Sequence, residues 1–100
     1  MILVTAVMKI KSEHRENYLA EVERLVIAAN QEAGALYYAH FENTNEPQTF
    51  AFIEKYKDQA ALEAHNQSEH FQTFFKEVET YLLEAPKIEV ATIKSVSYTH

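Results

Sequence analysis

Apolar and polar residues alternate along four short stretches of the chain, at residues 2–10, 35–42, 48–56 and 87–98. Between these stretches, apolar residues recur with helical spacing. The first stretch is apolar on both sides as far as Lys9, so we expect a strand covered on both faces over most of its length. The turn-forming segment 43–47 indicates a hairpin between the second and third stretches. A period of two is typical of β-strands, and it predicts strands at residues 2–10, 35–42, 48–56 and 87–98.

The longest helical pattern follows the first strand. Apolar residues recur there every three or four positions, which predicts an amphipathic helix over about residues 13–32. Ser12 is expected to cap its first turn, where Glu13 and Glu16 interact favourably with the helix dipole. Gly34, the single glycine of the sequence, is expected to end the helix in a left-handed cap.

Two shorter helices are predicted after the third strand. Asp58 can cap a helix over 59–65, and the polar residues 66–67 are expected to break it. Ser68 can cap the next helix, which Pro86 stops or follows. The apolar stripe of this second helix consists of Phe71, Phe74, Phe75, Val78, Tyr81 and Leu82.

The order of these elements is β-α-β-β-α-β. This order predicts one α+β domain over residues 1–100, with a ferredoxin-like four-stranded antiparallel sheet and the helices on one face. One hundred residues are enough for a single core, and the 47% hydrophobic content is enough to fill it.

The second face of such a sheet lacks helices, yet the strands are apolar on both sides. In the second strand, Tyr37, Ala39 and Phe41 oppose Leu36 and Tyr38. An apolar patch of that extent is uncommon on a monomer, so we expect a homodimer in which two copies pack sheet against sheet through the helix-free face. The alternative is that the tyrosine hydroxyls make this face tolerable to water.

Charge and composition limit the classes of molecule that the protein is expected to bind. The formal net charge of −6 argues against a nucleic-acid partner and against docking on anionic membranes. The sequence has no apolar run of 18 residues, and its N-terminus lacks the features of a signal peptide. It has no cysteine, which permits a reducing compartment, and we expect a cytoplasmic location. A single glycine rules out a glycine-rich phosphate loop.

Two residues stand out as candidate catalytic groups. His65 shares a helix face with Ala61 and Leu62, so it should point inward. It is either a core histidine with one hydrogen bond or a general base. Glu54 lies among aromatic residues on the strand face assigned to the helices, where burial would raise its pKa. It is either a structural hydrogen-bond partner or a proton carrier beside His65.

Other side chains are candidates for lining a pocket. His40 is expected to look into the same space as His65, and His70 lies in the first turn of its helix. His65 and His70 are five residues apart across a helix break, which is not a helical ligand pair, so we expect no metal site. The aromatic residues fit a core, and they can also wall a cavity for a flat ligand. These aromatic candidates are Tyr18, Tyr38, Phe52, Phe71 and Phe75.

Three blocks of the sequence resemble one family, the antibiotic biosynthesis monooxygenase (ABM) domains. The block EAGALYY at 32–38 resembles the family's E-x-G-x-L-x-Y entry into its second strand. The block FAFIEKY at 50–56 resembles the F-x-x-x-E-x-W third strand. The segment from 58 to 71, with AL at 61–62, a histidine at 65 and SEHF after it, resembles A-L-x-x-H-x-x-S-x-H-F.

The resemblance implies a quinol monooxygenase-like member of the dimeric α/β barrel superfamily. Members include cofactor-independent oxygenases of phenols and quinols, haem-degrading enzymes, and an isomerase-like protein of autoinducer-2 breakdown. Tyr56 stands where the family's third strand more often has tryptophan, and the sequence has no tryptophan at all. This departure argues against haem degradation and against the polyketide-oxidising chemistry of the family.

The leading hypothesis is a cofactor-free monooxygenase that oxidises a small phenolic or quinol-like compound with molecular oxygen. His65, with Glu54, would remove a proton, and the electron-rich anion would react with oxygen directly. Two alternatives stay open at this point. The same groups can isomerise a small hydroxyketone by proton transfer, or the domain can be a non-catalytic dimeric module that binds a small molecule.

Overall fold

The computed structural model describes residues 1–94, and the predicted strand segment from 95 to 98 lies outside the described residues. Four strands form one antiparallel sheet in the order β2-β3-β1-β4. The ferredoxin-like prediction is therefore confirmed. The strands are β1 (Ile2–Lys9), β2 (Ala35–Glu42), β3 (Thr49–Tyr56) and β4 (Lys87–Thr92).

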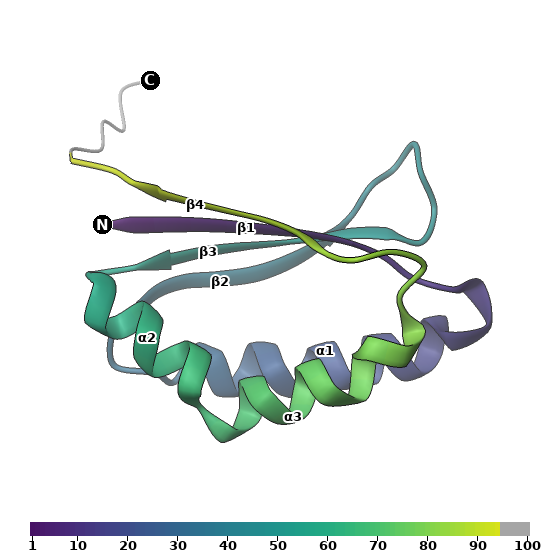
Figure 1. The fold of residues 1–100 in the computed structure, drawn as a ribbon, viewed down its shortest axis with the longest axis horizontal. Coiled ribbons are helices and arrows are strands. Elements are labelled where there is room, and N and C mark those ends of the chain that lie inside the picture. The colour runs from purple at the N-terminus through teal and green to yellow at the C-terminus, as the bar shows by residue number, and fades with distance from the viewer. Residues whose placement is uncertain (95–100) are drawn as a thin grey trace.

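Three α-helices lie on one face of this sheet (Figure 1). Short 3₁₀ turns at Ser12–His14 and Glu79–Tyr81 flank the first and last of them. The helices are α1 (Arg15–Ala29), α2 (Gln59–Gln67) and α3 (Glu69–Val78).

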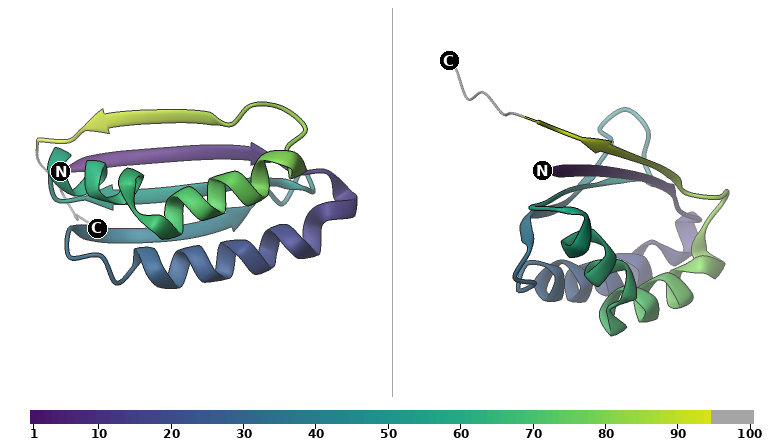
Figure 2. Two further views of the ribbon diagram at one scale, coloured as in Figure 1. Left: turned by 60° about the horizontal axis from the view of Figure 1, so that its bottom comes forward. Right: turned by 60° about the vertical axis from the view of Figure 1, so that its left-hand side comes forward.

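The core lies between the sheet and the helices. Alternate residues of β1 are buried, while their neighbours on the helix-free face are half-buried, as the alternation of the sequence predicts. In Figure 2 (left) no helix lies over β4, so the helix layer covers β2, β3 and β1 only. Ile88 and Val90 of β4 face the helix side beside Ala6 and Val4, yet they are 55% and 56% exposed. The sheet therefore overhangs the helices along β4.

Helix capping was predicted correctly for α2 and α3 and wrongly for α1. The Asp58 side chain accepts a hydrogen bond from the Ala61 amide at 2.9 Å, and the Ser68 hydroxyl accepts one from the Phe71 amide at 3.2 Å. Ser12 caps nothing with its side chain, because a 3₁₀ turn occupies its position and α1 begins only at Arg15. The predicted break at residues 66–67 is also wrong, because α2 continues to Gln67 and the chain turns at Ser68, where the backbone is extended.

Gly34 is required for close packing and not for a left-handed cap, so that expectation is wrong. Its φ is not positive. A Cβ atom at this position would lie 2.3 Å from the Cβ of Ala61, far inside van der Waals contact. The loop between α1 and β2 thus touches α2 through a position where only a hydrogen atom fits.

A bulge changes the start of β2. The register shifts between Ala35 and Tyr37, so the expected alternation that placed Leu36 with Tyr38 is interrupted. Leu36 is exposed, whereas Tyr38 is buried and pairs with Glu54 of β3. The bulge therefore removes Leu36 from the inward face and leaves Tyr38 and His40 on it.

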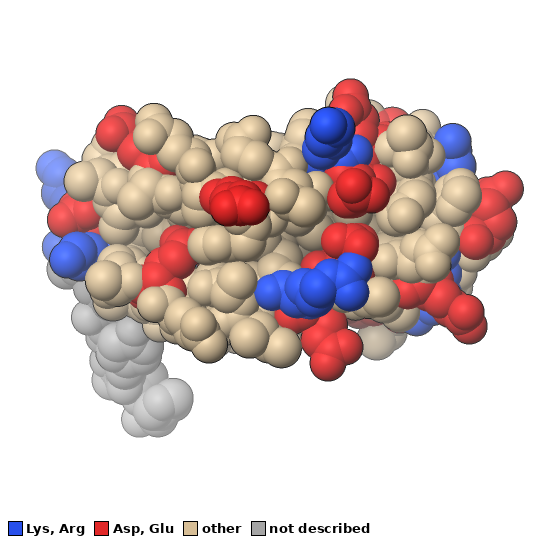
Figure 3. Space-filling model, turned by 90° about the horizontal axis from the view of Figure 1, so that it is seen from below, with Lys and Arg blue, Asp and Glu red and all other residues tan. Residues whose placement is uncertain are grey.

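The surface of the molecule differs between its faces. Figure 3 shows the helix side, where acidic side chains are scattered and basic ones are fewer and interspersed with them. On the helix-free side of the sheet, Tyr37 and Phe41 are 41% and 46% exposed. Among residues 1–94, no helix combines the length and the apolar character needed to cross a membrane.

Candidate functional site

A cavity of about 160 Å³ lies between the sheet and the two short helices α2 and α3. Its walls are mostly apolar, and the overhanging strand β4 contributes Ile88 and Val90 to them. Glu54 and His65 are the two ionisable side chains on its wall. The apolar residues around them are Val4, Ala6, Met8, Tyr38, Phe52, Leu62, Phe71, Phe74, Phe75, Pro86, Ile88 and Val90.

His65 is held in one orientation by a carboxylate. It lies one helical turn after Leu62 on the buried side of α2, and it is 1% exposed. Its Nδ1 is 2.8 Å from Oε2 of Glu32. Because an ionised carboxylate only accepts hydrogen bonds, Nδ1 is the nitrogen that has the proton, and Nε2 keeps its lone pair.

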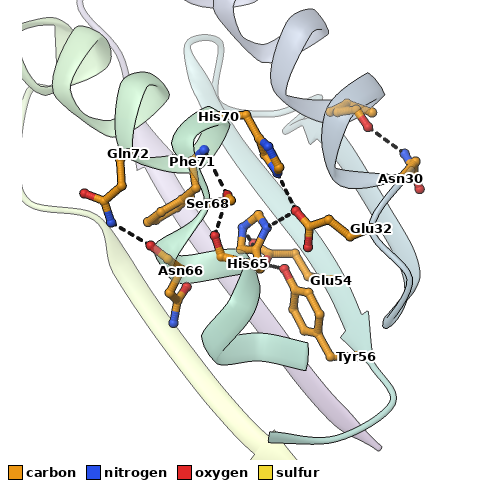
Figure 4. A network of polar contacts seen from close by, with 11 residues as sticks. Asn30, Glu32, Glu54, Tyr56, His65, Asn66, Ser68, His70, Phe71 and Gln72 are labelled. Atoms are coloured by element: carbon orange, nitrogen blue, oxygen red, sulfur yellow. Dashed lines mark hydrogen bonds and ion pairs between the residues drawn. The ribbon is translucent and has the colours of Figure 1, made fainter. Parts of the chain in front are cut away.

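The second ring nitrogen of His65 is free to act on a ligand. Within the described part of the chain, Nε2 is buried and has no hydrogen-bond partner. It lies 4.0 Å from Oε1 of Glu54, which is too long for a direct hydrogen bond. Figure 4 shows His65 close to both Glu32 and Glu54, with its contact to Glu32 drawn as a dashed line. An unpaired buried acceptor is uncommon, and here it belongs to a residue on the wall of a cavity.

Glu54 is a buried carboxyl group whose proton is easily exchanged near neutral pH. It points inward from β3, and its Oε1 accepts a hydrogen bond of 2.6 Å from the Tyr56 hydroxyl. Burial raises the pKa of Glu54 to about 7, the Tyr56 hydrogen bond opposes this rise, and the Glu32 charge adds to it. The upward direction agrees with the expectation from the sequence.

The pKa of His65 shifts in the opposite direction. Burial lowers it, and the hydrogen bond and charge of Glu32 only partly oppose this effect. Near neutral pH the imidazole is therefore neutral, with its lone pair on Nε2, while Glu54 exists in both protonation states. A neutral base and a carboxyl group that can give or take a proton thus face each other across 4.0 Å.

Glu32 is the site residue that the sequence analysis missed. It lies in the loop between α1 and β2, and its Oε2 accepts hydrogen bonds from His65 and from Nε2 of His70, the latter at 2.5 Å. The contact between Gly34 and Ala61 brings this loop against α2. The sequence signal that could have identified Glu32 is the E-x-G block. Its glycine, Gly34, allows the loop to approach α2 closely, and its glutamate, Glu32, is thereby brought near His65.

The predicted pocket residues divide into two groups. Tyr38, Phe52, Phe71 and Phe75 lie on the cavity wall. His40 and His70 do not line this cavity, and their role in binding a substrate stays a prediction.

His40 and His70 instead lie in separate surroundings. His40 Nε2 is 2.8 Å from the Tyr18 hydroxyl, at the edge of a surface groove between α1 and β2. His70 contacts Glu32 from the outer side, in a hollow with Glu21 and Arg24. The inward face of β2 extends beyond the cavity. His40 is on the same face as Tyr38, but it lies outside the cavity.

The cluster of Glu32, His65 and His70 offers three potential metal ligands within 4.8 Å of one another. The spacing argument against a histidine pair overlooked that the turn at Ser68 brings both imidazoles to one carboxylate. The distances of 2.8 and 2.5 Å between the Glu32 oxygen and the two nitrogens are nevertheless those of hydrogen bonds. Ligands around a tetrahedral metal at about 2.0–2.1 Å lie about 3.3 Å apart. The cluster is therefore arranged to hold protons.

Fold and site together define a ferredoxin-like domain with a histidine and a carboxyl group in an apolar cavity. The family model for antibiotic biosynthesis monooxygenases matches residues 1–77. The protein named "Putative monooxygenase YcnE" from Bacillus subtilis (strain 168) is 41% identical over 92 residues, which are 92% of this chain and 96% of that protein. The chain therefore belongs to the antibiotic biosynthesis monooxygenase family.

Solved structures agree with this assignment. One described as an antibiotic biosynthesis monooxygenase has a TM-score of 0.89 and 28% identity, over 95% of this chain and 100% of that one. A structure from Deinococcus radiodurans has a TM-score of 0.92 over 100% of this chain and 99% of that one. Its identity is 17%, so this second likeness shows the fold alone.

Proposed function

We propose that this protein is a cofactor-independent monooxygenase that oxidises a small phenolic or quinol-like compound with molecular oxygen. Family membership and the name of the Bacillus relative support a monooxygenase-like function in general. The observation that carries the narrower proposal is the free Nε2 of His65, which is buried beside an apolar cavity and has no partner among residues 1–94. A buried base of this kind suits the removal of a phenolic proton.

The size and walls of the cavity suit one aromatic ring. An apolar cavity of about 150 Å³ accommodates benzene, and this one has about 160 Å³. Tyr38, Phe52 and Phe71 supply flat apolar surface to such a ring. An oxygen atom placed between His65 Nε2 and Glu54 Oε1, which are 4.0 Å apart, can lie about 2.8 Å from both. A phenolic hydroxyl at that point can donate to the imidazole and accept from a protonated Glu54.

The proposed reaction converts a quinol and oxygen into a hydroxyquinone and water. His65 takes the phenolic proton, and the anion gives electrons directly to oxygen. One oxygen atom forms a new bond to a ring carbon, the O–O bond breaks, and the other atom leaves as water with two hydrogens. All four electrons come from the quinol, so the balance needs no further reductant.

Oxygen consumption tests this proposal. Wild type is mixed with a panel of single-ring hydroquinones in an oxygen electrode, and the quinone products are identified by mass spectrometry. We expect His65→Ala to lower the rate by about 100-fold or more, because the base is lost. His14→Ala is the matched control, since His14 stacks on Tyr81 and does not line the cavity. No uptake by wild type with any substrate, or equal uptake in the His65 variant, contradicts the proposal.

The pairing of His65 with Glu54 also favours a second reaction class. A neutral imidazole that takes a proton next to a carbonyl, and a carboxyl group with a pKa of about 7 that protonates the carbonyl oxygen, can isomerise a hydroxyketone. This reaction continues without oxygen, so anaerobic turnover would favour the isomerase. Ligand-induced stabilisation without any product would identify a binding module instead.

The homodimer stays a prediction of the sheet surface. Tyr37 and Phe41 are exposed on the helix-free face, among half-buried apolar residues of β1 and β3. Light scattering should give twice the monomer mass for wild type, and Tyr37→Lys with Phe41→Lys should give the monomer mass. A monomeric wild type would remove this prediction. The cytoplasmic location likewise stays a prediction.

A further inference from the structure

The hydrogen bonds of His65 continue beyond the cavity wall toward the surface. Its Nδ1 bonds to Glu32, and the same Glu32 oxygen bonds to Nε2 of His70. Exposure of these side chains rises from 1% for His65 through 17% for Glu32 to 31% for His70. Figure 4 shows the three side chains in this order, contributed by α2, the loop after α1, and α3.

We infer that Glu32 and His70 form a two-way proton path between the buried base His65 and solvent. A proton that arrives at His65 Nε2 from the cavity allows the Nδ1 proton to move to Glu32. In this scheme His70 has protons on both ring nitrogens. Its Nε2 donates to Glu32, and its Nδ1 releases a proton to water as Glu32 takes the proton from His65. Each step breaks one N–H or O–H bond and forms another, so one proton enters and one leaves.

This path gives the cavity a way to exchange protons while a substrate occupies it. The role of this path in catalysis rests on the proposed function. A quinol has two phenolic protons, and His65 can take the second only after it has passed on the first. When water forms at the end of the reaction, a proton returns by the same route, so the overall reaction releases none. Glu32 and His70 act through His65 and are positioning residues in this scheme.

Titratable and charged side chains lie on both sides of the path. On the cavity side, Glu54 and the Tyr56 hydroxyl of β3 face His65, and Tyr38 of β2 packs against its ring. On the outer side, the residues that line the hollow with His70 are Glu21 and Arg24 of α1 and Glu69 of α3. Glu21 and Arg24 pair with each other, so Glu32 is the carboxylate that contacts the His70 ring.

Solvent exchange of the His65 ring proton tests the path without any substrate. The rate is measured by NMR on protein with ¹⁵N-labelled histidine. We expect His70→Phe and Glu32→Gln each to slow this exchange by about tenfold or more, because a phenyl ring and an amide cannot pass a proton on. His14→Phe is the matched control and should leave the rate unchanged. Equal rates in wild type and both path variants would show that protons reach His65 by another route and would overturn the proposal.

Two further measurements complete the test. If wild type oxidises a quinol, His70→Ala should lower kcat with KM unchanged, and added imidazole should restore kcat. If it oxidises none, the proposed function fails while the exchange rates still decide on the path. Binding of one Zn²⁺ per chain to wild type and not to Glu32→Gln would identify a metal centre and overturn the proton path.

Discussion

Two histidines on the same side of the sheet, His65 buried and His40 half-buried, have different surroundings. His40 packs between Phe50 and Phe52, and its Nε2 is satisfied by the Tyr18 hydroxyl at 2.8 Å. His65 also packs among aromatic rings, but it lies on the cavity wall, and its Nε2 has no hydrogen-bond partner in the described chain. The pKa of each imidazole is lowered by burial, to about 4 for His40.

The comparison shows that burial alone does not make a histidine a base. Both rings stay neutral near pH 7, so both have a lone pair. The His40 lone pair or proton is engaged by Tyr18, and this pair has a structural role. In His65 the Glu32 carboxylate fixes the proton on Nδ1 and thereby directs the free Nε2 toward the cavity. His65, the candidate catalytic histidine, differs from His40 in two ways. One of its ring nitrogens is bonded to a carboxylate, and the other has no hydrogen-bond partner among the described residues.

Replacing each histidine with phenylalanine gives the largest expected contrast. His65→Phe should lower turnover by about 10²–10⁴-fold, because the base is removed. His40→Phe should leave turnover close to wild type and lower the free energy of unfolding by about 1–3 kcal/mol, since the buried Tyr18 hydroxyl keeps only its weak contact with the Met8 sulfur. Steady-state rates and urea unfolding measure the two effects. Equal losses of turnover in both variants would remove the distinction drawn here.

The sequence predicted the scaffold well because its signals are local. Alternation predicted the strands, and the caps at Asp58 and Ser68 depend on residues three positions away. The direction of His65 and Glu54 followed from the same periodicities. Periodicity predicts which side of an element a residue occupies, and it correctly placed both candidate catalytic side chains on the inward side.

The remaining features depend on contacts between distant segments. Glu32 lies 33 positions from His65 in the chain, and contacts such as the close approach of Gly34 to Ala61 bring them together. No periodicity reports such an approach. His40 was misplaced for the same reason, because the extent of the cavity along β2 is set by α2 and α3 and not by β2 itself.

The pH dependence of stability gives the next contrast. Glu54 has a pKa of about 7 when folded and 4.5 as the reference value, so it stays protonated in the fold while the unfolded chain ionises. Stability is therefore lost as pH rises from about 4.5 to 7, by about 3 kcal/mol. Glu54→Gln removes this loss, so the variant should gain on wild type between pH 5 and pH 8 in urea unfolding.

His40 should behave in the opposite way. Its pKa is about 4 when folded and 6.5 as the reference value, so its contribution is complete above pH 6.5 and is lost as pH falls toward 4. His40→Phe should therefore weaken the acid-side loss and leave the loss between pH 5 and 8 from Glu54 in place. If the difference in unfolding free energy between Glu54→Gln and wild type does not change between pH 5 and pH 8, the raised pKa of Glu54 is contradicted.

The smallest expected effect concerns the contact between Gly34 and Ala61, which brings the loop with Glu32 close to His65. Gly34→Ala places a methyl group 2.3 Å from the Ala61 Cβ, so α2 has to move away from the loop that contains Glu32. We expect a loss of about 1–3 kcal/mol in unfolding free energy, as for other overpacked contacts. The ¹⁵N signals of the His65 ring should also shift while those of His40 stay unchanged.

Ala61→Gly added to Gly34→Ala should restore the His65 signals, because it removes the methyl group on the other side of the contact. Ala61→Gly alone costs about 1 kcal/mol in helix propensity and serves as the control for the double variant. A double variant that keeps the shifted signals would show that Gly34 acts through its backbone and not through close packing. Restoration would show that a single interatomic contact holds Glu32 where it orients His65, a requirement that His40 does not have.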